Sequence, residues 1–184
     1  AGCYDDALAY YNKCVKINLL TNNSLFACAN IYLHQGNFSK ATASAEQISD
    51  KYLASLMLSR IWFAKKDYGR AELLLNNLLK EKQSCQTALY DKARILAAKE
   101  KTDEALEILY PLSNSEELQV PANYLIADIL LTKKRNLKEA EQALDKSLNK
   151  FPLHSDSHRL RGIIHFRKKE MAELIFVDPT AQEK

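Results

Sequence analysis

The sequence has little of the residues that bend or break helices. Only four glycines and four prolines occur among its 184 residues, whereas Ala, Leu, Lys and Glu are abundant. Glycine and proline concentrate in turns, and those four common residues favour helix, so the composition predicts long helices and disfavours an all-β protein. Hydrophobic residues make up 47% of the chain, which is enough to bury a substantial core without metal or disulfide support.

Three further absences narrow the class of protein. No apolar stretch reaches the ~20 residues that cross a bilayer, and no secretory signal is visible, so we expect no membrane association. The net charge of +3 is too small to indicate a nucleic-acid-binding surface. The cysteines form no CxxC pair, so we expect reduced thiols and an intracellular protein, cytoplasmic or nuclear. They are Cys3, Cys14, Cys28 and Cys85.

No signature of catalysis is present. The chain lacks GxGxxG, GxxxxGK[ST], HExxH and GxSxG motifs, so we expect no enzyme and no cofactor. His154, His158 and His165 have the spacing of one helix face and could in principle hold zinc. His158 and His165 occupy repeat positions that hold packing residues in the other units, so we favour packing and expect no metal.

An internal repeat organises the chain. Alanines recur at intervals of 34, 30, 34 and 35 residues, each preceded three places earlier by an aromatic, apolar or Thr residue. Mostly apolar residues follow each of them at four and seven places, which is the spacing of one helix face. These marker alanines are Ala7, Ala41, Ala71, Ala105 and Ala140.

A second small residue lies twelve or thirteen places before each later marker, and a larger residue follows it three places on. Each unit therefore contains two helices, and the small residues allow antiparallel helices to approach closely. Gly36 and Asn37 lie between the helices, where Gly or Asn can take the left-handed conformation that ends a helix. Pro152 closes the fifth unit. The small residues are Ala29, Ser59, Ala93 and Ala127, and Gly162 continues the series although its own marker alanine is missing.

This pattern resembles the tetratricopeptide repeat, a 34-residue helix-turn-helix unit, over nearly the whole chain. The stretch Gly36-Asn37-Phe38-x-x-Ala41 and the pair Phe151-Pro152 match best. The resemblance implies an all-α, right-handed superhelical solenoid of antiparallel helix pairs in a single domain, 1–184, either cut from a longer array or ending in capping helices. The expected units are 1–21 (second helix only), 22–51, 52–85, 86–119, 120–153 and 154–184 (degenerate or capping).

The resemblance also implies where a partner binds. The first helices of such an array line its concave wall, so we expect a non-catalytic scaffold that holds a peptide, a partner subunit or its own copy there. The wall combines aromatic residues with arginine and suits a peptide with acidic and apolar side chains, although some aromatics could instead pack between helices. The expected partner-binding residues are Phe26, Asn30, Leu56, Arg60, Phe63, Tyr90, Arg94, Tyr124, Asp128, Arg159 and Phe166.

Some members of this family bind the C-terminal carboxylate of chaperones through a clamp of Lys, Asn and Arg. Asn30 fits one place of that clamp. The following units offer Met57 and Asp91 where Asn and a basic residue would be needed. We therefore expect a different kind of ligand.

A second resemblance concerns the stretches 24–32, 50–52 and 60–66. They are similar to the N-terminal repeats of anaphase-promoting-complex scaffold subunits, which self-associate through this part of the array. This implies a homodimer and a role in a cell-cycle ubiquitin ligase complex. The alternative is a helical-repeat RNA-binding protein that uses the concave arginines and aromatics, which the small net charge makes the less favoured interpretation.

Overall fold

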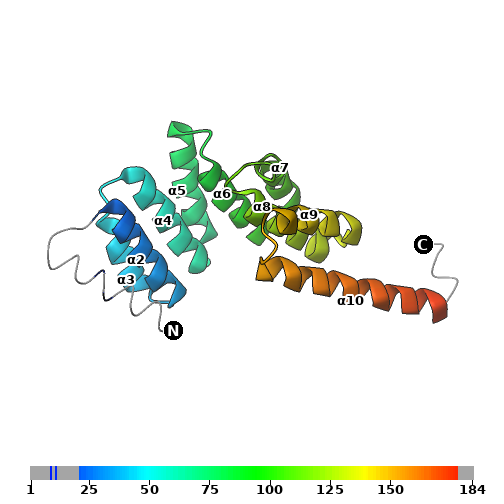
Figure 1. Ribbon diagram of the computed structural model, residues 1–184. Helices are drawn as coiled ribbons and strands as arrows, with labels where there is room; N and C mark the ends of the chain where they lie inside the picture. The colour runs from blue at the N-terminus through cyan, green and yellow to red at the C-terminus, as the bar shows by residue number, and fades with distance from the viewer. Residues whose placement is uncertain (1–8, 10, 12–20, 178–184) are drawn as a thin grey trace. The chain divides into compact units, whose positions relative to one another are not determined.

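The computed structural model describes residues 9, 11 and 21–177, with side chains up to residue 170. All regular structure in these residues is helical, which confirms the predicted all-α class (Figure 1). The elements are α2 (Asn22–His34), α3 (Phe38–Glu46), α4 (Lys51–Ala64), α5 (Tyr68–Glu81), α6 (Gln86–Ala98), α7 (Thr102–Leu112), α8 (Gln119–Ile129), the π-helical turn η1 (Leu130–Lys134), α9 (Leu137–Lys150) and α10 (Ser155–Val177).

The chain forms two compact units, Ala1–Ile95 and Leu96–Lys184. In the first unit α2 packs against α3 and α4 packs against α5, and in the second unit α8 packs against both α7 and α9. The expected repeat 1–21 lies outside the described residues except for positions 9, 11 and 21. No helix in the described part of the chain has both the length and the apolar character to cross a membrane.

Polar caps fix where three of the second helices begin, whereas Lys101 before α7 makes no such cap. Asn37, Asp67 and Asn136 precede α3, α5 and α9, and each side chain accepts a hydrogen bond from the backbone N–H three residues later. Each of these caps lies four places before a marker alanine. Thr21 and Ser24 form a reciprocal capping box at the start of α2. The repeat therefore specifies the start of its second helix as well as its apolar face.

The residue just before the cap has a left-handed backbone in four successive turns. The φ angles are 72° at Gly36, 64° at Lys66, 64° at Glu100 and 52° at Arg135. The expected left-handed residue is therefore confirmed at Gly36, whereas Asn37 is a helix cap. Three side-chain-bearing residues adopt the same conformation, which is costly outside glycine. Helix pairing, rather than glycine, thus sets the shape of these turns.

The small residues lie between the helices, as the repeat predicts. Ala29, Ala93 and Ala127 are fully buried, and Ser59 is 1% exposed. The marker alanines from Ala41 onward are fully buried too. Gly162 is exposed, and a Cβ built on it would meet nothing within 4 Å. Its face of α10 is open because no second helix follows α10 in the described residues.

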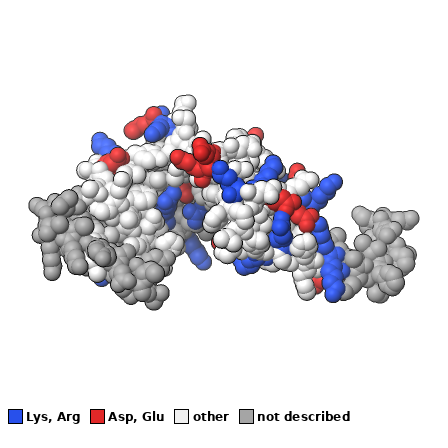
Figure 2. All heavy atoms as spheres, viewed as in Figure 1, with Lys and Arg blue, Asp and Glu red and all other residues white. Residues whose placement is uncertain are grey.

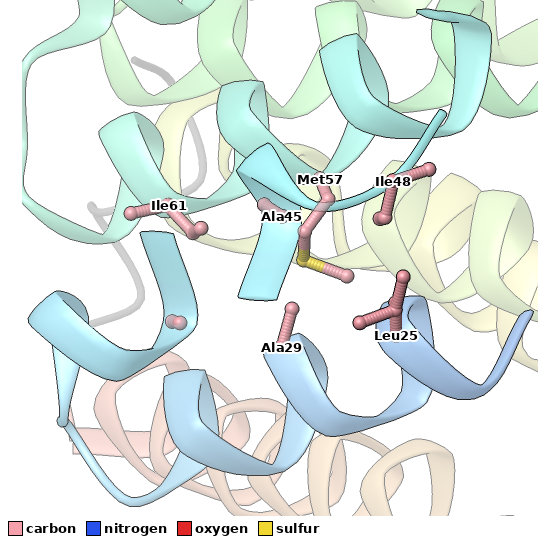
Figure 3. Close-up of a cluster of buried hydrophobic side chains, with 7 residues drawn as sticks. Leu25, Ala29, Ala45, Ile48, Met57 and Ile61 are labelled. Atoms are coloured by element: carbon pink, nitrogen blue, oxygen red, sulfur yellow. The ribbon is translucent and has the colours of Figure 1, made fainter. Parts of the chain in front are cut away.

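The core of the first unit shows this packing directly. In Figure 3 side chains from α2, from α4 and from the α3 region point toward one another around Ala29 and Ala45. The cluster combines its alanines with larger leucine, isoleucine and methionine side chains. This combination of large and small side chains lets the helices interlock. The cluster comprises Leu25, Ala29, Ala41, Ala45, Ile48, Met57 and Ile61.

One helix pair departs from the common spacing. Ala140 lies thirteen positions after Ala127, whereas the small residue and the marker alanine are twelve positions apart in the other repeats. The π-helical turn η1 accommodates the extra residue. The N–H of Asn136 consequently bonds the carbonyl of Leu130, 3.0 Å away. That carbonyl lies one residue further from the marker than the corresponding acceptors in the other turns.

The packing at Ala29 makes a testable prediction. Ala29→Leu forces a large side chain between α2 and its neighbours, so we expect the free energy of unfolding to fall by about 1–3 kcal/mol. Ala27→Leu is the matched control, because Ala27 is exposed on the same helix, and its effect should stay within about 0.5 kcal/mol. Urea unfolding followed by circular dichroism measures both. Equal effects of the two substitutions would contradict the close packing of these helices.

Candidate protein-binding surface

A buried carboxylate joins two arginines in the first unit. Arg60 Nε on α4 donates to Asp91 Oδ2 at 2.6 Å, and Arg94 Nη1 on α6 donates to Asp91 Oδ1 at 3.3 Å. Asp91 is 4% exposed, whereas the Arg60 and Arg94 side chains remain 22% and 37% exposed. The group therefore carries one net positive charge at the surface, and its carboxylate holds both guanidinium groups in place.

Both guanidinium groups also lie over aromatic rings. The Arg60 guanidinium carbon is 5.6 Å from the centre of the Phe26 ring, and that of Arg94 is 4.8 Å from the Phe63 ring. A guanidinium can stack on a ring while its in-plane N–H groups donate to carboxylates. The first helices of the first unit thus present fixed cationic donors beside apolar rings. We call Phe26, Arg60, Phe63, Asp91 and Arg94 the arginine cluster.

Other residues expected on this surface have different surroundings. Leu56 is 3% exposed and belongs to the core, so it offers no surface to a partner. Phe26 and Phe63 pack partly against that same core, so helix packing, one of the two roles that the sequence left open, applies to both rings. Asn30 on α2 and Tyr90 on α6 are half-buried.

The second unit contains its own smaller set of expected residues. Arg159 Nη2 on α10 donates to the Tyr124 hydroxyl on α8 at 3.1 Å. Burial raises the pKa of Asp128, and the charge of Arg159 acts against that rise. Burial, followed by the charge of Asp128, also raises the pKa of Tyr124. Phe166 is 63% exposed on α10. These four residues combine one basic, one acidic and two aromatic side chains.

Basic residues elsewhere in the second unit are largely paired. Lys133 Nζ lies 2.7 Å from a Glu100 oxygen, and Lys168 Nζ lies 2.5 Å from a Glu141 oxygen. Figure 2 shows blue and red side chains interspersed over the part of the molecule that Figure 1 labels α9 and α10. That face carries no continuous field of one sign, which is the electrostatic feature that phosphate backbones require.

The three histidines are placed apart from any metal-binding arrangement. His154 Nδ1 lies 2.7 Å from the Ser157 hydroxyl, and His158 Nε2 donates to the Pro152 carbonyl at 2.7 Å. The prediction that His158 and His165 pack in the core is wrong, because both are exposed where no second helix covers α10. In the described residues, no group of three His, Cys, Asp or Glu side chains is arranged to hold a metal ion.

Asp91 is the functional candidate that the sequence interpretation missed. In the sequence Asp91 stands out only as a mismatch to a chaperone clamp, whereas in the structure it orients Arg60 and Arg94. Two features of the sequence indicate this role. Arg94 follows Asp91 by three residues on one helix face. Arg60 occupies the same position in its repeat as Arg94 does in the next repeat. Met57 is fully buried, so neither it nor Asp91 is placed to complete such a clamp.

Comparison with known families agrees with this architecture. The family model for the tetratricopeptide repeat matches residues 56–110 and 124–173, more than half of the chain. The chain belongs to the tetratricopeptide-repeat family. No curated protein sequence matches it.

Several solved structures share the tetratricopeptide-repeat fold of this chain. TTC0263, a thermophilic protein of this family from Thermus thermophilus, has 18% identity and a TM-score of 0.79, over 90% of this chain and 92% of that one. YrrB, described as having an unusual peptide-binding site, has 19% identity and a TM-score of 0.58, over 88% and 84%. The Cut9–Hcn1 hetero-tetramer of the APC/C has 17% identity and a TM-score of 0.69, over 89% and 33%. The chain thus has the fold of a protein–protein interaction scaffold.

The half-buried Asp128 gives a pH-dependent prediction. Its pKa in the folded protein is raised by burial, so the stability it contributes is present below the unfolded value of about 3.9 and is lost as pH rises through the folded value. We therefore expect Asp128→Asn to raise the melting temperature at pH 7 and to have little effect at acid pH. The exposed Glu117 provides the control, Glu117→Gln. A stabilisation by Asp128→Asn that persists at acid pH would contradict this.

Proposed function

We propose that this chain is a non-catalytic scaffold that binds an acidic, partly apolar segment of a partner protein on the first helices of its first unit. The arginine cluster is the observation that supports it. A partner carboxylate would meet guanidinium donors that Asp91 and the two phenylalanine rings already hold in position. Each guanidinium carries five N–H donors, more than its bond to Asp91 uses.

The energetics of the cluster favour a role in binding over a role in stability alone. Burying a carboxylate and orienting two long side chains around it costs desolvation and conformational entropy, and an apolar trio is often at least as stable. Fixing arginines before a partner arrives lowers the entropy lost on binding. Arginine and aromatic residues also dominate the energy of protein interfaces. The cluster therefore suits recognition of acidic side chains flanked by apolar ones.

The alternative of RNA binding gains no support from these observations. Arg60 and Arg94 share one carboxylate, which offsets half of their charge. In the second unit Arg159 lies 3.9 Å from Asp156 and bonds Tyr124. Each of these arginines therefore has a carboxylate nearby, which reduces the positive charge available to a phosphate backbone. The tetratricopeptide-repeat fold, which is a protein-interaction fold, favours a polypeptide ligand.

Peptide titration tests the arginine cluster. The probe is a short peptide that alternates glutamate with leucine, and its counterpart carries lysine in place of glutamate. Arg94→Gln leaves Asp91 paired with Arg60 and so preserves the fold. We expect it to weaken binding of the acidic peptide about fivefold, because one partly exposed ion pair is lost. Calorimetry or fluorescence anisotropy measures the change.

The matched control is Lys80→Gln, which removes a positive charge from α5 rather than from a first helix. It should leave binding of the acidic peptide unchanged. Equal weakening by the two variants, or equal affinity for the acidic and basic peptides, would contradict the assignment of this surface.

A narrower version of the proposal makes the chain a self-associating scaffold subunit of an anaphase-promoting-complex-like ubiquitin ligase, located in the cytoplasm or nucleus. It is supported by the resemblance of residues 24–32 and 60–66 to such subunits. The likeness to Cut9–Hcn1, at 17% identity, shows the fold alone. Cys85 is a buried free thiol, which fits a reducing compartment.

Self-association is the measurable part of this narrower version. Sedimentation velocity between about 1 and 100 μM should show a concentration-dependent shift from monomer to dimer, because association of one chain with its copy follows mass action. A monomer throughout that range would rule out the homodimer and leave the peptide-binding proposal standing.

A further inference from the structure

A second surface, unrelated to the arginine cluster, lies between second helices of the second unit. Two adjoining recesses of about 410 and 120 Å³ open between α7 and α9. They share Tyr110, Leu130 and Glu139 in their linings, so they form one continuous depression. We call it the α7–α9 groove. Helix α8, which packs against both α7 and α9, lies beneath it.

Each wall of the groove is one face of a helix. The α7 residues follow the i, i+3, i+4, i+7 spacing that aligns side chains along a helix, and the α9 residues repeat that spacing. On α7 they are Asp103, Leu106, Glu107 and Tyr110. On α9 they are Glu139, Gln142, Ala143 and Lys146.

The floor of the groove is apolar and its middle is aromatic. Leu106, Ile126 and Leu130 are at most 6% exposed and close the bottom. Tyr110 is 45% exposed, so its ring is available to a ligand. Asn123 lies in the floor with its side-chain N–H groups donated to backbone carbonyls. The floor therefore demands no polar group from a ligand.

The inserted residue of η1 shapes this groove. Leu130 begins the π-helical turn and Lys134 ends it, and both line the larger recess. π-helical turns are single-residue insertions that recur at functional sites. The extra residue between Ala127 and Ala140 is accommodated in η1, and two side chains of η1, Leu130 and Lys134, therefore line the groove.

The charge around the larger recess is predominantly negative. Three carboxylates line it, those of Asp103, Glu107 and Glu139, against the single ammonium group of Lys134. Lys134 is paired with Asp103. Glu139 accepts a hydrogen bond from the Asn136 side chain at 2.8 Å, and Glu107 is exposed and has no ion-pair partner within the described part of the chain. Two carboxylates beside an apolar floor therefore lack a cation.

We propose that the α7–α9 groove docks a segment of a partner protein that carries arginine next to a large apolar residue. The guanidinium lies between Glu107 and Glu139, where its planar fork can donate to both carboxylates. The apolar side chain lies on Leu106 and Leu130 against the ring of Tyr110, which adds contact area at little entropic cost. The groove thus selects a basic partner segment, opposite in charge to the ligand of the arginine cluster.

Amide chemical shifts of the isotopically labelled chain test the site directly. The probe is a short peptide that alternates arginine with leucine, compared with the same peptide carrying glutamate. We expect the basic peptide to shift amides of α7 and α9 and the acidic peptide to leave them unchanged. Glu107→Lys should weaken binding of the basic peptide about fivefold or more, since an attraction becomes a repulsion.

Three further variants complete the design. Tyr110→Ala should weaken binding, and Tyr110→Phe, which keeps the ring, should not, so loss of packing is separated from loss of the hydroxyl. Glu116→Lys makes the same charge change at an exposed position outside the groove and should bind as the unaltered chain does. Circular dichroism checks that each variant folds.

Two results would overturn the proposal: shifts of α7 and α9 that are the same for both peptides, or a loss of affinity in Glu116→Lys as large as in Glu107→Lys. Arg94→Gln separates this site from the arginine cluster, because it should leave binding in the groove unchanged. Failure of either surface therefore does not decide the other.

Discussion

Close approach of helices at small side chains is the constraint on which this molecule depends. Ala29, Ser59, Ala93 and Ala127 are at most 1% exposed, and buried side chains of this size allow neighbouring helices to approach closely. That approach dictates tight turns, and it holds Lys66, Glu100 and Arg135 in a left-handed conformation that such residues rarely adopt. It also leaves the side chains of Arg60 and Arg94 on two first helices 22% and 37% exposed. The core thus creates the surface that is available for binding.

On that surface the chain retains a charge arrangement that stability alone does not explain. Asp91 is 4% exposed and lies between two arginines. Its attraction to them largely offsets the free-energy cost of removing its charge from water, so the net gain in stability is small. Its clearer consequence is geometric, because two long flexible side chains acquire fixed positions over Phe26 and Phe63. Orientation before binding is a property of recognition surfaces.

The two proposed binding surfaces differ in their charge. The arginine cluster belongs to first helices of the first unit and suits acidic segments. The α7–α9 groove belongs to second helices of the second unit and suits basic ones. A scaffold that distinguishes its ligands by charge can hold two partner segments without competition between them. Both surfaces follow from the same repeat, one from its first helices and the other from its second helices.

Helix composition, repeat spacing and the small residues were all readable from the sequence, because local propensity and one-dimensional periodicity determine them. Only the tertiary structure revealed that Leu56 is buried, that His158 and His165 are exposed, and that Asp91 binds two arginines. Exposure depends on which neighbouring helix is present, and an ion pair across 31 residues depends on how successive first helices stack. The extra residue before Ala140 was visible as a spacing of thirteen, but its effect on a groove wall required the helices that surround it.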